Sequence, residues 1–164
     1  MMGRFGRVQG GLAAALLSIA GACTSPSLAG CDAVRNEYIV RDGRVILQET
    51  AAILPSLDIQ QQFLIYHCSA RASRPSLTDL RPTIAAQANA GPFLVEAVRD
   101  APDDVTVLSA VELLAEMKRQ GTFYAGNDPE TMAILNLRVF AIRSEAQRML
   151  AQSHVAYLQR DATE

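Results

Sequence analysis

The chain has 164 residues, of which 49% are hydrophobic and 5% aromatic, and its formal net charge is −2. Without Arg4 and Arg7, which lie in a predicted leader, the chain has thirteen basic and seventeen acidic side chains and a net charge of −4. This acidic balance argues against a nucleic-acid partner, because such binding relies on a basic surface that neutralises phosphates. Few aromatic residues, no tryptophan and abundant alanine and leucine favour helix over sheet.

Residues 1–29 have the three-part order of a secretory signal peptide. Arg4 and Arg7 come first, an uncharged stretch from residue 10 to 22 follows, and small residues lead to Ala29. The apolar stretch is about a dozen residues long, whereas a helix that spans a membrane needs roughly twenty. We therefore expect export to the periplasm or the exterior, without a transmembrane anchor.

Three cleavage sites compete in this leader. Cleavage after Ala29 would release a free domain, since Ser27 and Ala29 place small residues at the −3 and −1 positions. Cys23 and Cys31 each end a segment that resembles the lipobox of bacterial lipoproteins, in which the cysteine is diacylated. Either lipid would hold the domain on a membrane surface, which is the only membrane contact we expect.

The cysteines predict one disulfide. If the leader ends after Ala29, or if Cys23 carries a lipid, the mature chain keeps Cys31 and Cys68, and such a pair joins in an oxidising compartment. The bond would tie the N-terminal arm to the first long helix and add roughly 3 kcal/mol of stability. The alternative is that Cys68 is a small buried hydrophobic residue.

Residues 30–55 are expected to form an N-terminal arm with a small β-hairpin. The segment from Tyr38 to Leu47 contains two β-prone runs separated by Asp42 and Gly43, a pair that tolerates the positive φ angles of a tight turn. An isolated two-stranded ribbon is only marginally stable, so the hairpin would have to lie on the helices.

Residues 56–160 predict an all-α domain of about six short helices, packed as antiparallel hairpins in an α-solenoid-like array. A cap at Ser56 starts the first helix, Arg74 and Pro75 end it, and Ser144 with Gln147 forms a capping box for the last. The helices are expected to begin near the following residues: Ser56, Ser76, Gly91, Asp104, Asp128 and Ser144.

The clearest helix covers residues 104–120 and ends at Gly121. Its polar residues fall on one stripe at helical spacing, namely Thr106, Ser109, Glu112, Glu116 and Arg119. The remaining surface is apolar, so this helix needs neighbours on more than one side. The next helix is expected to direct four apolar residues inward, namely Met132, Leu135, Val139 and Ile142.

Residues 78–118 resemble one HEAT-type helical repeat. The resemblance rests on the run from Ala90 to Asp100, followed by Asp103, Asp104 and Val105 and then by Ala110, Leu113 and Leu114. It implies a short α-solenoid of a kind that mostly binds other proteins, and it carries over no catalytic residues.

No group of residues predicts a catalytic, cofactor-binding or metal site. His67 and Cys68 are neighbours on a helix and project about 100° apart, and a zinc site needs three or four ligands. Glu112 and Glu116 lie one turn apart, which permits a carboxylate pair for acid–base work. We favour instead a solvated stripe in which Glu116 pairs with Arg119.

The loop from Gly121 to Asn127 places two aromatic residues, Phe123 and Tyr124, between the two clearest helices. If exposed, either ring would anchor a partner protein. The alternative is that both rings cover the end of the helical core.

The sequence thus predicts an exported helical module of the bacterial envelope that binds or scaffolds another protein, whose identity stays open. The competing hypothesis is a small periplasmic enzyme whose site is assembled from scattered acidic and tyrosine residues. A pocket that gathers Glu112, Glu116 or His67 with shifted pKa values would favour the enzyme.

Overall fold

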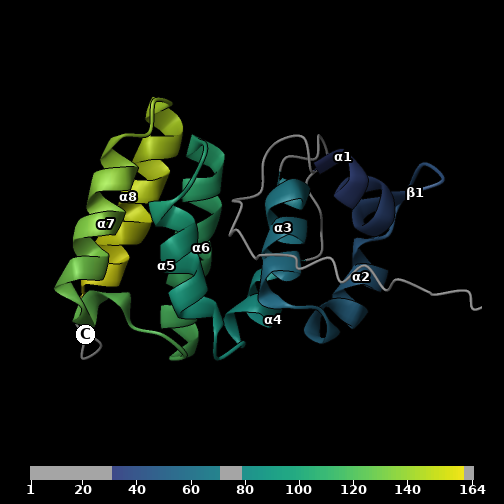
Figure 1. Ribbon diagram of the computed structural model, residues 1–164, viewed down its shortest axis with the longest axis horizontal. Coiled ribbons are helices and arrows are strands. Elements are labelled where there is room, and N and C mark those ends of the chain that lie inside the picture. The colour runs from purple at the N-terminus through teal and green to yellow at the C-terminus, as the bar shows by residue number, and fades with distance from the viewer. Residues whose placement is uncertain (1–30, 71–78, 161–164) are drawn as a thin grey trace, which may run out of the picture.

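The computed structural model describes residues 31–70 and 79–160 (Figure 1). The predicted leader with its cleavage site after Ala29 and its lipid candidate Cys23, the predicted helix end at Arg74 and Pro75, the predicted start at Ser76 and the polar tail lie outside the described residues. Within the described part, no helix combines the length and apolar character needed to cross a membrane.

The fold is all-α, as predicted, and a helix follows each of the six expected starts, although the second begins only at Arg81 and has five residues, which is shorter than predicted. These helices are α3 (Ile59–Ala70), α4 (Arg81–Ala85), α5 (Ala90–Arg99), α6 (Asp104–Gln120), α7 (Pro129–Phe140) and α8 (Glu145–Gln159). Two further short helices precede them, α1 (Cys31–Val34) and α2 (Leu47–Ile53). Single turns of π or 3-10 helix complete the described chain, namely η2 (Arg35–Ile39), η3 (Leu54–Ser56) and η4 (Ala125–Asn127).

The small hairpin is confirmed. Strands β1 (Val40–Arg41) and β2 (Arg44–Val45) pair antiparallel, with Val40 opposite Val45. Asp42 and Gly43 have φ angles of 51° and 76°, the two positive values that a tight hairpin turn of this twist requires. Val40 packs against the core whereas both residues of β2 are exposed, so only β1 lies on the helices as expected.

The N-terminal residues are more helical than the sequence suggested. Ile39, Leu47 and Leu54 are at most 2% exposed and join the same core as the later helices. The hydroxyl of Thr50 on α2 donates to the carbonyl of Tyr38 at 2.5 Å, which holds α2 against η2. Residues 31–54 therefore add to the helical core.

A disulfide joins Cys31 to Cys68, as predicted, with 5.3 Å between the two Cα atoms. It connects α1 to α3 across 37 residues of sequence. The bond thereby secures the N-terminal segment on the first long helix.

The last four helices form two stacked hairpins (Figure 1). Helix α5 lies against α7 and α6 against α8, so the two hairpins share a two-layer arrangement. Helices α3 and α4 pack on α6 from the other direction. Apolar residues around α6 are fully buried, including Ala110, Val111, Leu113, Leu114 and Met117. The expectation that this helix needs neighbours on several sides is confirmed.

Capping residues satisfy the free backbone groups at several helix ends, and two of the predicted caps differ in the structure. Asp103 accepts from the N–H of Thr106, and Gly121 closes α6 with a φ of 72°. Helix α3 is capped by Asp58, which exchanges hydrogen bonds with Gln61, so the predicted cap at Ser56 is wrong. Helix α8 begins after Ser144, but the side chain of Ser144 makes no capping bond.

Several caps come from a neighbouring helix. Arg138 on α7 donates to the carbonyls of Val98, at 3.1 Å, and Ala101 at the end of α5. The ammonium of Lys118 on α6 donates to the carbonyls of Tyr157, at 2.7 Å, and Leu158 at the end of α8. Positive charge at a helix C-terminus is stabilising because the carbonyls there carry partial negative charge. These bonds fix the register of the stacked hairpins.

Replacing both bridged cysteines (Cys31→Ser with Cys68→Ser) should lower the free energy of unfolding by about 3–4 kcal/mol, because the unfolded chain gains the entropy of an open loop. Urea denaturation measures the change. Wild-type protein treated with a thiol reductant should match the variant. An unchanged transition midpoint in both samples would show that the disulfide does not restrain the N-terminal segment.

Candidate functional site

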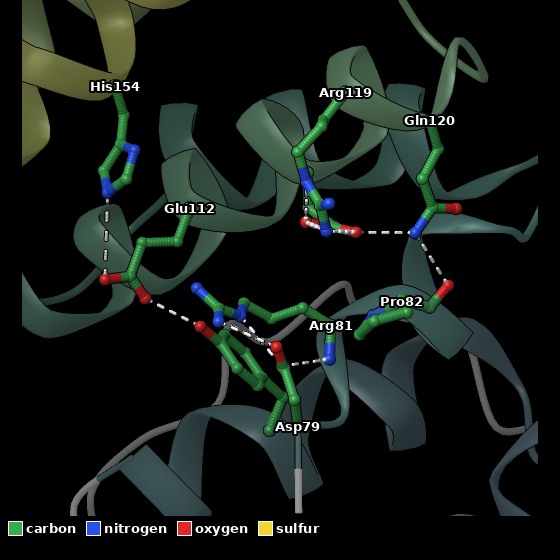
Figure 2. A network of polar contacts seen from close by, with 9 residues as sticks. Asp79, Arg81, Pro82, Glu112, Arg119, Gln120 and His154 are labelled. Carbon is green, nitrogen blue, oxygen red and sulfur yellow. Dashed lines mark hydrogen bonds and ion pairs between the residues drawn. The ribbon is translucent and has the colours of Figure 1, made fainter.

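Polar side chains from several helices meet on one side of α6, where the sequence places its polar stripe (Figure 2). We call this group the polar seam. Its members come from α3, from the start of α4, from α6 and from α8. They are Tyr66, Asp79, Arg81, Glu112, Glu116, Arg119, Gln120 and His154.

Glu112 is the meeting point of three helices. The hydroxyl of Tyr66 on α3 donates to Oε2 of Glu112 at 2.6 Å. Nε2 of His154 on α8 lies 4.0 Å from the other carboxylate oxygen, Oε1. The Glu112 side chain is 20% exposed and Tyr66 is 8% exposed, so this contact is shielded from bulk water.

Two ion pairs lie beside that contact. Arg81 donates through Nε and Nη2 to the two oxygens of Asp79, at 2.8 and 2.7 Å, and these bonds lower the pKa of the Asp79 carboxyl. Arg119 donates to both oxygens of Glu116, the shortest at 2.5 Å, as the sequence predicted for this pair. Gln120 donates to Glu116 at 2.7 Å and to the carbonyl of Pro82 on α4 at 3.2 Å. The seam therefore links α4 to α6 through Gln120.

The predicted solvated stripe is wrong. Thr106 is 0% exposed, Ser109 is 2% exposed and Glu116 is 7% exposed. The stripe is covered because α3, α4 and α8 all pack on α6. Two of these buried residues pair within or next to α6: Thr106 bonds to Asp103, and Glu116 bonds to Arg119 and Gln120.

The protonation behaviour of the seam suits hydrogen bonding between helices. Burial raises the pKa of Tyr66 far above its usual value, and the charge of Glu112 adds to the rise, so Tyr66 stays protonated and acts as a donor. Burial lowers the pKa of His154, and this outweighs the opposing effect of Glu112. At neutral pH the seam thus contains a neutral imidazole and a neutral phenol.

The other residues singled out from the sequence lie apart from the seam. His67 is fully buried on α3 with its ring centroid 6.0 Å from that of Phe63, and Cys68 is in the disulfide. In residues 31–70 and 79–160, no three or more histidine, cysteine or acidic side chains gather as metal ligands would.

Phe123 and Tyr124 face different surroundings. Phe123 is partly buried against the core, where its ring covers Gly91; a Cβ atom on Gly91 would lie 2.3 Å from that ring. Tyr124 is 40% exposed. Of the two proposed anchors, Tyr124 is the one that reaches the surface.

The large apolar side chains with the highest exposed fractions among the described residues lie on the α7–α8 hairpin. Leu137 and Phe140 on α7 are 71% and 77% exposed, and Met149 on α8 is 63% exposed. Between the two helices runs a groove of about 430 Å³. Its lining residues are Asn136, Leu137, Val139, Phe140, Gln152, Val155, Ala156 and Gln159. We call this surface the α7–α8 face.

The sequence contains a signal for this face outside the inward stripe of α7. The inward stripe of α7, confirmed in the structure, contains Met132, Leu135, Val139 and Ile142. Leu137 and Phe140 fall outside that stripe, three residues apart, so the helix has large apolar side chains on a second side.

The α7–α8 face is uncharged. None of its lining residues is ionisable, and its polar members are the three amides Asn136, Gln152 and Gln159. Three charged residues of the hairpin point to other parts of the chain: Arg138 reaches α5, His154 faces Glu112, and Glu130 at the start of α7 lies 3.9 Å from Arg99. This combination of exposure, concavity and neutrality is typical of a surface that meets another apolar surface.

Tyr66→Phe should lower the free energy of unfolding by about 1.5–3 kcal/mol, because Glu112 loses the donor that compensates for its partial burial. Thermal or urea denaturation measures this loss. Tyr124→Phe is the matched control, since the same hydroxyl is removed from a ring that is 40% exposed. If both variants lose equal stability, the Tyr66–Glu112 bond does not hold α3 on α6.

His154 should make stability depend on pH between about 7 and 5. Its pKa is lower in the folded chain than the unperturbed value of about 6.5, so the unfolded chain binds the proton first as the pH falls. The contribution of His154 to the free energy of unfolding is fully present above the unperturbed pKa. It declines as the pH drops toward the lower pKa of the folded chain. The difference in unfolding free energy between wild type and His154→Gln should therefore shrink over this range, with His67 unchanged in both. Parallel curves from pH 8 to 5 would contradict the assignment.

The chain matches no family model, no curated protein and no solved structure. The HEAT-type resemblance of residues 78–118 therefore stays a prediction. The function has to be inferred from the polar seam and the α7–α8 face.

Proposed function

We propose that the chain is an exported helical module of the bacterial envelope that binds another protein through the α7–α8 face. The observation that carries this proposal is the exposure of Leu137 and Phe140, at 71% and 77%, beside an uncharged groove. Fully burying a leucine or phenylalanine side chain is worth about 1.5–3 kcal/mol, so covering these two residues would contribute substantially to a complex.

The stacked arrangement of the hairpins supports this proposal. In an array of helical hairpins each unit is covered by the next, and the terminal unit usually has a polar outer surface that ends the array. Among the described residues, the α7–α8 hairpin presents apolar side chains that no other helix covers. A partner that packs on this face would cover it as one hairpin of such an array covers the next.

The chemistry of the face favours an uncharged apolar helical surface as its occupant. A groove between two adjacent helices accepts the ridge of side chains on a third helix. A charged partner surface would lose water without gaining an opposite charge, because the groove lining has no ionisable residue. Amide groups at the edges can hydrogen-bond to polar groups at the margin of such a contact.

The disulfide supports the exported location. A bond between Cys31 and Cys68 that closes a segment of the core is stable in an oxidising compartment such as the periplasm and is rare in the cytosol. The predicted leader, with or without a lipid at Cys23 or Cys31, would deliver the chain there. With Cys31 in the disulfide, Cys23 or a free terminus after Ala29 fits the structure better.

The competing proposal, a small enzyme built on Glu112 and Tyr66, has less support. A catalytic base or acid works best with a pKa near the operating pH, whereas the pKa of Tyr66 is moved far above it. Glu112 accepts a hydrogen bond from Tyr66 on α3, and Glu116 accepts from Arg119 and Gln120 on α6 itself. The seam is better explained as the polar connection between the early helices and α6.

A photo-reactive amino acid in place of Gln152, on the wall of the groove, should form a covalent adduct with a protein in cells that export the chain. The same amino acid in place of Gln48, an exposed glutamine on α2, is the matched control and should form none. Adding Phe140→Ser should remove the adduct at position 152 while changing the unfolding free energy by less than about 0.5 kcal/mol, because the side chain is exposed. Absence of any adduct at position 152 would contradict the proposed function.

A further inference from the structure

We infer that the surface covering the α7–α8 face is the same face of a second copy of this chain, in a two-fold symmetric dimer. This inference rests on the proposed binding role of the face and names its partner. In such a dimer one patch meets its own copy, so the patch must be complementary to itself in shape, charge and hydrogen bonding.

The shape of the face meets this requirement. Leu137 and Phe140 project from α7, while the groove lies directly beside them, with the buried Val139 and Val155 as its floor. A ridge and a hollow are thus neighbours on one surface. A two-fold rotation about an axis through the face would place each ridge in the hollow of the other copy.

The charge of the face also meets the requirement of self-complementarity. The mature chain has an excess of acidic residues, so most self-contacts would bring like charges together. The groove lining carries no charge, and the side chains of Arg138 and His154 on the same two helices reach α5 and Glu112. This is a surface on which two acidic chains can meet without direct repulsion.

The polar groups at the margin are also able to pair with themselves. Gln152 and Gln159 each carry both a hydrogen-bond donor and an acceptor, so two copies of one amide can bond across a symmetry axis. A carboxylate offers only acceptors and a guanidinium only donors, and neither can bond to its own copy. The use of amides at these positions fits a contact between identical surfaces.

The size of the face sets the expected strength. Helices of twelve and fifteen residues are about 18 and 22 Å long, so two of them side by side present a footprint of roughly 20 by 20 Å. Counted on both copies, this footprint is on the order of 800 Å², below the roughly 1,200–2,000 Å² of stable specific interfaces, so the contact is a weak one. We expect a dimer that dissociates on dilution into the micromolar range.

Sedimentation of the purified, processed chain over a concentration series tests the inference. Wild type should shift from monomer to dimer as the concentration rises. Leu137→Glu and Leu137→Arg should each raise the apparent dissociation constant at least about tenfold, because Leu137 also lines the groove and each copy would bring its new charge next to the like charge of the other. An equal mixture of the two variants should regain much of the lost association. Val45→Ser, at an exposed apolar residue on β2, is the matched control and should leave association unchanged.

The outcomes separate this inference from the proposed function. A monomer at every concentration, or a dimer that the Leu137 variants do not weaken, would overturn the second copy as the occupant. The mass of the adduct formed at position 152 in cells gives an independent reading. An adduct of twice the chain mass supports the inference, and an adduct with a different protein overturns it while the binding role stands. No adduct together with a monomer would overturn both.

Discussion

The burial of α6 on several sides is the constraint on which the structure depends. Ten of its seventeen residues are buried, and the neighbours that bury them come from both directions along the chain. A helix of this length is marginal alone in water, so its stability comes from packing against the other helices. Covering it completely also brings a row of polar residues out of water. The buried carboxylates are tolerated because each has a hydrogen-bond donor: Glu112 accepts from Tyr66 on α3, and Glu116 accepts from Arg119 and Gln120 on α6 itself.

This constraint explains the different characters of the two candidate sites. The polar seam looks like a cluster of catalytic residues in sequence, yet its groups are engaged with one another and connect α3, α4 and α8 to α6 (Figure 2). The α7–α8 face differs from the seam because its side chains are apolar and exposed. No other helix of the described residues covers Leu137 or Phe140.

Local signals in the sequence were sufficient for much of the fold. The bounds of α6, the hairpin turn at Asp42 and Gly43 and the disulfide all follow from residues close in sequence or from a single pair. The seam could not be predicted, because Tyr66 and Glu112 are 46 residues apart and meet only once α3 packs on α6. Helix α2 was missed because seven residues are too few to show a helical period. The α7–α8 face required knowing which side of α7 is covered, and periodicity alone does not show this.

The bonds of Lys118 to the end of α8 have a consequence for any chemistry aimed at amines. It is the only lysine in the chain, and its nitrogen is occupied by carbonyls of another helix. Acetylation of Lys118 would remove the positive charge that caps the C-terminus of α8. It would thereby weaken the attachment of α8 to α6, although Lys118 does not line the groove. Reagents that seek a freely exposed amine would therefore react poorly at Lys118 while the fold is intact.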